Sequence, residues 1–91
     1  MDKIYLFESV FYDNKTNIQY VGTDGKKPFR ELKDAIDYGD KVHEMKINDF
    51  SRSKSPFTHE VKEFSGRIKR RYILKDDMFL YVNTIEELTL V

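Results

Sequence analysis

Cysteine and tryptophan are both missing from the 91-residue sequence. Without cysteine the chain has no disulfide framework, no thiolate zinc site and no thiol chemistry. Proteins without disulfides are typical of reducing compartments. We therefore expect a cytoplasmic protein.

Long hydrophobic runs are also missing. No apolar stretch approaches the roughly 20 residues that a membrane-spanning helix needs. The first eight residues, MDKIYLFE, lack the apolar core and the small-residue cleavage site of a signal peptide. These absences predict that the protein has no membrane partner and is not exported.

Residues with G/C-rich codons are scarce, with 4 glycines, 2 prolines and 1 alanine. Residues with A/T-rich codons, such as Phe, Tyr, Ile, Asn and Lys, are abundant. This bias indicates an AT-rich genome and led us to the hypothesis of a phage or mobile-element protein.

The length predicts a single domain that spans residues 1–91. Hydrophobic residues make up 40% of the chain and charged residues 35%, against a usual charged share of about 25%. Seven Phe and six Tyr offset the low hydrophobic content, because each buried aromatic side chain removes about 150–250 Å² from water. We expect a small core that depends on aromatic residues.

The N-terminal segment predicts a hairpin. Residues 3–12 are rich in aromatic and β-branched residues, 13–16 contain turn formers, and 17–21 form the return strand. Both faces of the first strand are largely apolar, which is typical of a central strand covered on both sides.

The middle of the chain predicts one helix and one strand. Residues 22–27 have a loop composition, Pro28 suits a first helical turn, and Gly39 suits a helix end. Between them, Phe29, Leu32, Ala35 and Ile36 recur at helical spacing. Residues 42–50 alternate between apolar and polar, which predicts a half-buried strand.

The C-terminal half predicts a second hairpin. Residues 51–58 have a loop composition and 60–64 suggest a short strand. Residues 67–75 and 78–83 form the hairpin, joined at Asp76-Asp77, while 84–91 fit either a helical turn or a strand. The fold class predicted is α+β, a small, mainly antiparallel sheet of about five strands with two hairpins and one amphipathic helix packed on a face.

Charge is unevenly distributed along a chain with no net charge. Residues 51–75 carry eight basic and two acidic side chains, whereas residues 76–91 carry four acidic and no basic ones. The basic segment indicates a surface that binds an acidic protein or phosphates.

A partner-binding surface is therefore predicted from the cations of this segment and its tyrosine. Alternation along the 67–75 strand separates Ile68, Arg70 and Tyr72 from a row of cations on the other face. The candidate partner-binding residues are Arg52, Lys54, Arg67, Lys69, Arg70, Arg71 and Tyr72. The alternative interpretation is that these cations pair with Asp76, Asp77, Glu86 and Glu87 on a neighbouring strand.

No motif indicates catalysis, a metal site or a cofactor. His43 and His59 are far apart in the sequence and lack a metal-ligand spacing. The carboxylate pairs, such as Asp34 and Asp37, occur where turns and solvated helix faces usually place them. We expect a protein that is not an enzyme and has no cofactor.

Three functions follow from these observations. The first is a small non-enzymatic protein-binding module, for example a phage-encoded or mobile-element-encoded inhibitor or adaptor of a host complex. The alternative is a nucleic-acid-binding domain that uses its sheet, with aromatic stacking and cation contacts to phosphates. The third is a homodimer formed through an edge strand or the 84–91 tail.

Overall fold

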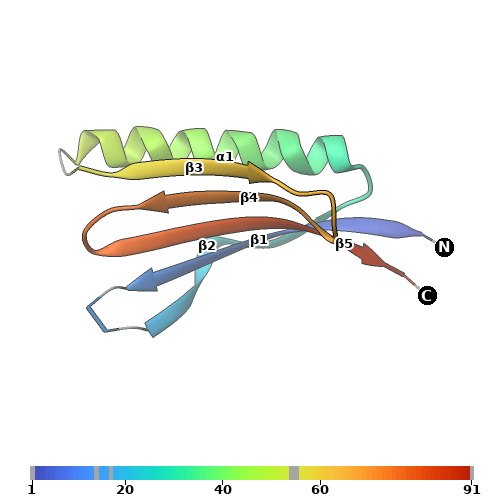
Figure 1. Ribbon diagram of the computed structural model, residues 1–91, viewed down its shortest axis with the longest axis horizontal. Coiled ribbons are helices and arrows are strands. Elements are labelled where there is room, and N and C mark those ends of the chain that lie inside the picture. Colours follow the sequence, from blue (N-terminus) through green and yellow to red (C-terminus); the bar gives the residue numbers. More distant parts are fainter. Residues whose placement is uncertain (1, 14, 17, 54–55, 91) are drawn as a thin grey trace.

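The computed structural model describes residues 2–13, 15–16, 18–53 and 56–90, with the backbone alone for residues 18–25. Five strands and one helix follow each other as β1 (Lys3–Asp13), β2 (Ile18–Phe29), α1 (Leu32–Arg52), β3 (Thr58–Glu63), β4 (Ile68–Lys75) and β5 (Phe79–Thr89). The strands form one antiparallel sheet in the order β2-β1-β5-β4-β3 (Figure 1). The predicted α+β fold class is confirmed.

The first and last strands form the centre of the sheet. β1 and β5 pair along their whole lengths, from Lys3 opposite Thr89 to Asp13 opposite Phe79. Residues 84–89 of the C-terminal tail, which the sequence left open between helix and strand, are therefore the second half of a central strand. Figure 1 shows the start of β1 and the end of β5 side by side.

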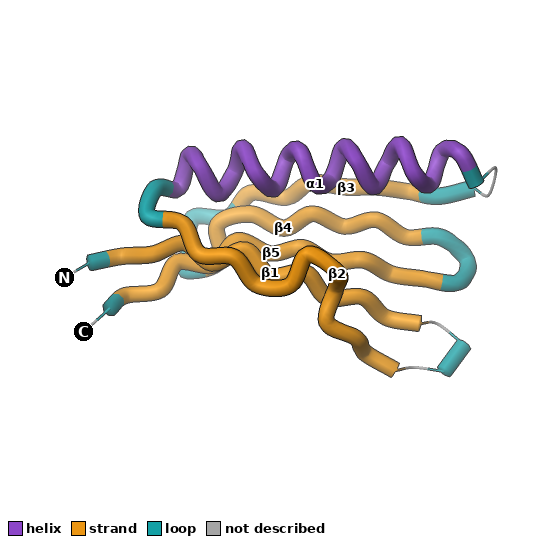
Figure 2. The backbone as a smooth tube through the Cα atoms, turned by 180° about the vertical axis from the view of Figure 1, so that it is seen from behind, coloured by secondary structure: helices purple, strands orange, loops and turns teal. Residues whose placement is uncertain are grey.

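Helix α1 connects the two edges of the sheet. It follows the edge strand β2, lies along one face, and leads to the opposite edge strand β3 (Figure 2). Among the described residues, no helix combines the length and the apolar character that a membrane crossing requires.

Four predictions for the middle of the chain are wrong. Gly39 lies inside α1 instead of ending it, and residues 42–50 continue the helix instead of forming a strand. Pro28 belongs to β2 instead of a first helical turn, and β2 extends through the whole of the expected loop at 22–27. The pattern of residues 42–50 also fits helical spacing, and packing on the sheet selects the helix, because Val42 and His43 are buried with Ala35 and Gly39 on one side of it.

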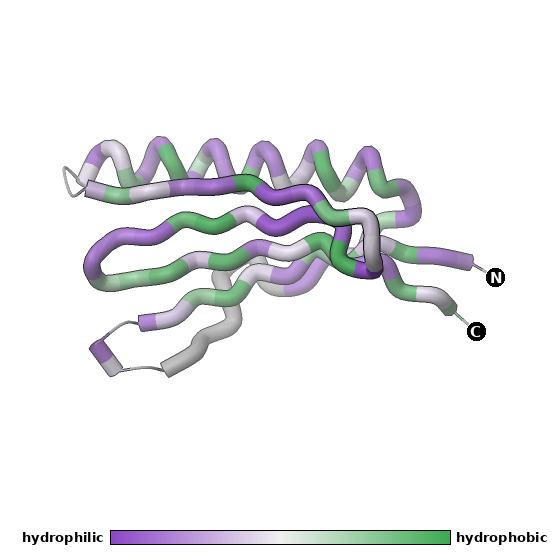
Figure 3. The backbone as a smooth tube through the Cα atoms, in the orientation of Figure 1, coloured by the Kyte–Doolittle hydropathy of each residue, from purple (hydrophilic) through white to green (hydrophobic). Residues whose placement is uncertain are grey.

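The core lies between α1 and one face of the sheet. Its buried residues come from the helix and from three neighbouring strands, namely Phe7, Ala35, Val42, Tyr72 and Ile85. The strand register explains why these residues lie together. Phe7 is opposite Ile85, and two residues further along each strand Ser9 is opposite Asn83, which is also opposite Tyr72. Residues two apart in a strand share a face, so all five side chains point to α1. The edge strand β3 contributes no buried residue to this core, and Figure 3 shows that it is largely hydrophilic.

Gly39 allows the helix to approach the sheet closely. A Cβ atom added there would lie 2.7 Å from Cε2 and 2.7 Å from the hydroxyl oxygen of Tyr72. Tyr72 is 1% exposed and cannot move aside without disturbing the core. The contact therefore requires the smallest residue at this position.

We predict that Gly39→Ala destabilises the protein even though alanine is the better helix former. Alanine gains about 1 kcal/mol of helix propensity, whereas overpacking in a core costs about 1–3 kcal/mol. The expected net loss in the free energy of unfolding is about 1 kcal/mol, measured by urea denaturation. Gly66→Ala is the matched control, because a Cβ at Gly66 meets nothing within 4 Å, and a Gly39 variant as stable as this control would contradict the prediction.

Candidate functional site

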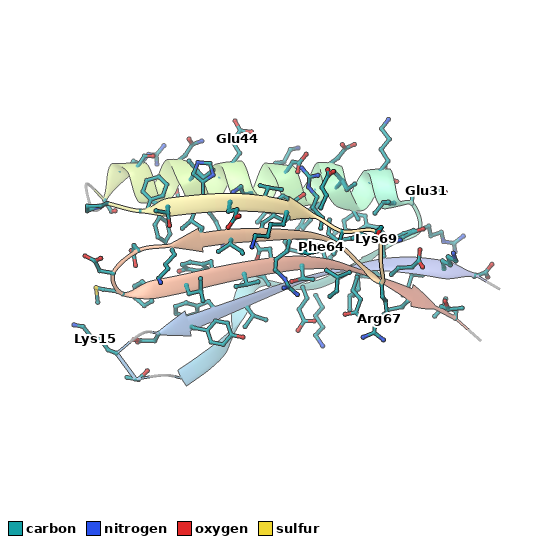
Figure 4. All side chains as sticks on the ribbon, in the orientation of Figure 1. Lys15, Glu31, Glu44, Phe64, Arg67 and Lys69 are labelled. Atoms are coloured by element: carbon teal, nitrogen blue, oxygen red, sulfur yellow. The ribbon has the colours of Figure 1, made fainter. Side chains whose placement is uncertain are left out.

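The residues predicted to bind a partner do not form one surface. Arg52 is exposed in the last turn of α1. Arg67 lies in the connection between β3 and β4, and Lys69 lies at the start of β4, both towards the other end of α1 (Figures 1 and 4). Lys54 lies outside the described residues. Arg70 and Tyr72 point towards α1 instead of outwards.

Tyr72 is part of the core and of a polar cluster that attaches β4 to α1. Its hydroxyl donates a hydrogen bond to Asp40 Oδ1 at 2.6 Å, with the Ile36 carbonyl oxygen 3.3 Å away. Arg70 Nη2 lies 3.2 Å from the same Asp40 oxygen, and Arg70 Nη1 also bonds Glu63. Burial raises the pKa of Tyr72, and the bond to Asp40 adds to the effect. The expected stacking surface is therefore a structural residue.

Carboxylates of the acidic C-terminal segment neutralise two of the remaining cations. Arg67 Nε lies 3.3 Å from Glu86 Oε1, and Lys69 Nζ lies 3.7 Å from Glu87 Oε1. Arg67 is 73% exposed, and exposed pairs contribute only about 0–1 kcal/mol to stability. Lys69 and Glu87 are 22% and 21% exposed, and Glu87 also pairs with Lys3. For Glu86 and Glu87 the geometry corresponds to the alternative in which the two charged segments pair with each other. Asp76 Oδ1 instead accepts hydrogen bonds from the backbone N–H groups of Met78 and Phe79.

Arg71 is the exception among the predicted residues. It lies on the face of the sheet opposite to α1, where its guanidinium carbon is 5.8 Å from the ring centroid of Phe64. Arg71 Nε is buried and has no hydrogen-bond partner among the described residues. A register shift between Ile68 and Arg70 brings Ile68 to the same face, although strict alternation had placed it with Arg70.

The face that carries Arg71 is a surface that sequence reasoning did not single out. We call it the open face, because no described helix or strand packs against it (Figures 1 and 2). It contains a shallow depression of about 590 Å³. The residues that line it come from β1, β4 and β5 and are Glu8, Val10, Tyr12, Ile68, Arg71, Ile73, Leu80, Val82, Thr84 and Glu86.

A second depression continues the first towards the β3–β4 connection. Its volume is about 470 Å³, and it shares Ile68 and Arg71 with the larger one. Phe64, which is 42% exposed, lies at its wall beneath Arg71. An exposed aromatic ring, an arginine and branched aliphatic side chains in one shallow groove are the composition of a protein-docking surface.

One signal in the sequence did point to this face. The apolar positions on both faces of β1 predicted a strand covered on both sides, and α1 covers only the face of Phe7. Ile4, Leu6 and Val10 on the other face remain partly exposed. The pattern thus indicated a second covering layer that the described chain does not supply.

The two histidines, far apart in the sequence, meet between α1 and β3. The ring centroids of His43 and His59 are 5.5 Å apart, and that of Tyr72 is 5.3 Å from His43. His43 Nε2 is buried and has no hydrogen-bond partner among the described residues. Burial lowers the pKa of His43 and His59 lowers it further, while Asp40 opposes the shift. In the part of the chain that the structure describes, no three His, Asp or Glu side chains gather where they could hold a metal ion.

Comparison with protein-family models, with curated proteins and with solved structures gave no match to this chain.

We predict that stability decreases in mild acid because of His43. Its folded-state pKa is lowered, so the unfolded chain binds this proton more readily, and stability falls as the pH drops below the unfolded value of about 6.5. His43→Gln should flatten this part of the curve of unfolding free energy against pH. His59→Gln should retain a smaller decline, because burial of His43 persists; a His43→Gln curve as steep as that of the parent would refute the assignment.

Proposed function

We propose that the protein is a protein-binding module that docks its partner on the open face of the sheet. The observation that carries the proposal is a mainly apolar depression across three strands, with Arg71 and Glu8 among the residues that line it. Contiguous apolar surface of this kind marks interaction sites in proteins. Its place on the rigid centre of the sheet supports the same conclusion, because preorganised surfaces lose less entropy on binding.

The partner that this face suits differs from the one expected from the sequence. An acidic partner was expected from the basic segment, but Arg67, Lys69 and Arg70 are paired with carboxylates of the chain itself. The open face favours a partner with an apolar surface and a carboxylate placed to meet Arg71. A role as inhibitor or adaptor of a host complex remains a prediction, as does binding of nucleic acid, which gains no support from cations that are already paired.

We predict that Val82→Glu abolishes partner binding without unfolding the protein. Val82 lies in the middle of the open face on β5, between Val10 and Ile73. A carboxylate there is tolerated in contact with water but costs several kcal/mol when it is buried unpaired in an interface. The parent chain and the Val82→Glu variant are each immobilised and exposed to a lysate of the source cells. The variant should retain at least about tenfold less of each specific partner than the parent chain does.

Met45→Glu is the matched control for this experiment. Met45 is 60% exposed and belongs to α1, on the other side of the sheet from the open face. The Met45→Glu substitution introduces the same charge as Val82→Glu and should leave the set of captured proteins unchanged. Circular dichroism confirms that both variants are folded, and equal capture by the two variants would contradict the proposed function.

A further inference from the structure

We infer that the partner on the open face is a second copy of this chain, so that the protein forms a two-fold symmetric dimer in which the two sheets pack face to face. This inference rests on the proposed function, since it names the occupant of the same face. The argument comes from the order of charges and apolar side chains across the three central strands.

One row of the open face carries opposite charges at equal distances from β5. Arg71 of β4 and Glu8 of β1 both lie opposite Thr84 of β5, so Thr84 separates a cation from an anion. Neighbouring strands are about 4.8 Å apart, which places the two charged residues roughly 10 Å from each other. Among the described residues, no ion pair joins the two side chains across Thr84. Glu8 Oε1 lies 4.0 Å from Lys26 Nζ, at the outer limit of an ion pair, and remains available to a closer cation.

A two-fold axis that runs along β5 between the two sheets would bring these charges together. Such an axis places β5 over β5 and places β4 of each copy over β1 of the other. Arg71 of each copy then lies over Glu8 of the other, which creates two equivalent ion pairs. Arg71 Nε is already buried within its own chain, so Glu8 of the other copy would meet the terminal nitrogen atoms of the guanidinium group.

The same axis matches the apolar rows. Val82 of β5 has Ile73 on one side and Val10 on the other. Across the axis Val82 would meet Val82, and each Ile73 would meet Val10 of the other copy. Branched aliphatic residues from two sheets interdigitate in aligned sandwiches, where the sheets lie about 10 Å apart.

One residue of the face is placed less favourably and already has a partner. Glu86 of β5 would lie near Glu86 of the other copy. Each Glu86 is held by Arg67 of its own chain at 3.3 Å, so the pair of carboxylates is accompanied by two guanidinium groups.

The size of the face agrees with a dimer. The two central strands have 11 residues each. The edge strand β3 and its neighbour β4 are shorter, with 6 and 8 residues. At about 3.4 Å per residue and about 4.8 Å per strand, the five strands together cover roughly 780 Å². A stable interface buries about 800 Å² on each partner. A dimer that covers the whole sheet is therefore close to the usual size.

The limited core of the monomer supports the same conclusion. Among the described residues, the buried hydrophobic side chains are Phe7, Ala35, Val42, Tyr72, Leu74 and Ile85. Ser9, His43 and Asn83 are buried with them, each with a polar atom that lacks a hydrogen-bond partner among the described residues. Covering the open face would add a second apolar layer on the other side of the same strands.

Sedimentation equilibrium from micromolar to millimolar concentration tests the dimer, with charge-swapped variants of the full chain. Arg71→Glu and Glu8→Arg should each weaken the dimer at least about tenfold, because each creates two like-charged contacts. The double variant restores opposite charges at both contacts and should recover most of the lost affinity. Val82→Glu should be monomeric, and Met45→Glu should dimerise like the parent chain.

The outcomes separate this inference from the proposed function. A parent chain that stays monomeric throughout, or a double variant no better than the single variants, overturns the dimer; capture of another protein that Val82→Glu loses would still support the proposed function. A dimer that Val82→Glu leaves intact overturns the face-to-face arrangement, since such a dimer must use another surface.

Discussion

The contact between Gly39 and Tyr72 sets how the helix lies on the sheet. The glycine lets α1 approach the ring, and the next residue, Asp40, accepts the hydrogen bond from the tyrosine hydroxyl. Arg70, two residues before Tyr72 on β4, pairs with the same carboxylate. Steric fit, a hydrogen bond and an ion pair thus act at one place, and the position of the other core residues under the helix follows from them.

This attachment also uses the residues that look most like binding residues in the sequence. Arginine and tyrosine are the side chains that interfaces prefer, but Arg70 and Tyr72 hold the protein together. A buried tyrosine needs an acceptor for its hydroxyl, and a partly buried guanidinium needs carboxylates, so both are satisfied within the chain. The surface near them gains no net positive charge as a result.

Helix α1 covers one face of the sheet. The composition of the other face, the open face, therefore determines which partners the sheet can bind. A charged or polar open face would complete a monomer, as in many two-layer proteins. Here Val10, Ile73 and Val82 form an apolar row in its middle, flanked by the charges of Glu8 and Arg71. A face with this pattern is suited to another protein surface, and its arrangement about β5 makes it complementary to itself.

Local sequence patterns were enough to predict the fold class, both hairpins and the double-sided apolar character of β1. These features depend on composition and on a period of two, which a strand expresses wherever it lies. The charge distribution also suggested the pairing of the basic segment with the acidic one. That residues 42–50 are helical could not be predicted in this way, because their pattern fits both periods and contact with the sheet is what distinguishes them.

Tertiary packing was also needed to decide which candidate site residues are accessible. Tyr72 is buried because α1 lies over it, and Ile68 changes face because a register shift interrupts the alternation of β4. The open face joins residues of β1, β4 and β5 from opposite ends of the chain, from Glu8 to Glu86. Such proximity arises from strand order, and strand order depends on long-range pairing that no local pattern encodes.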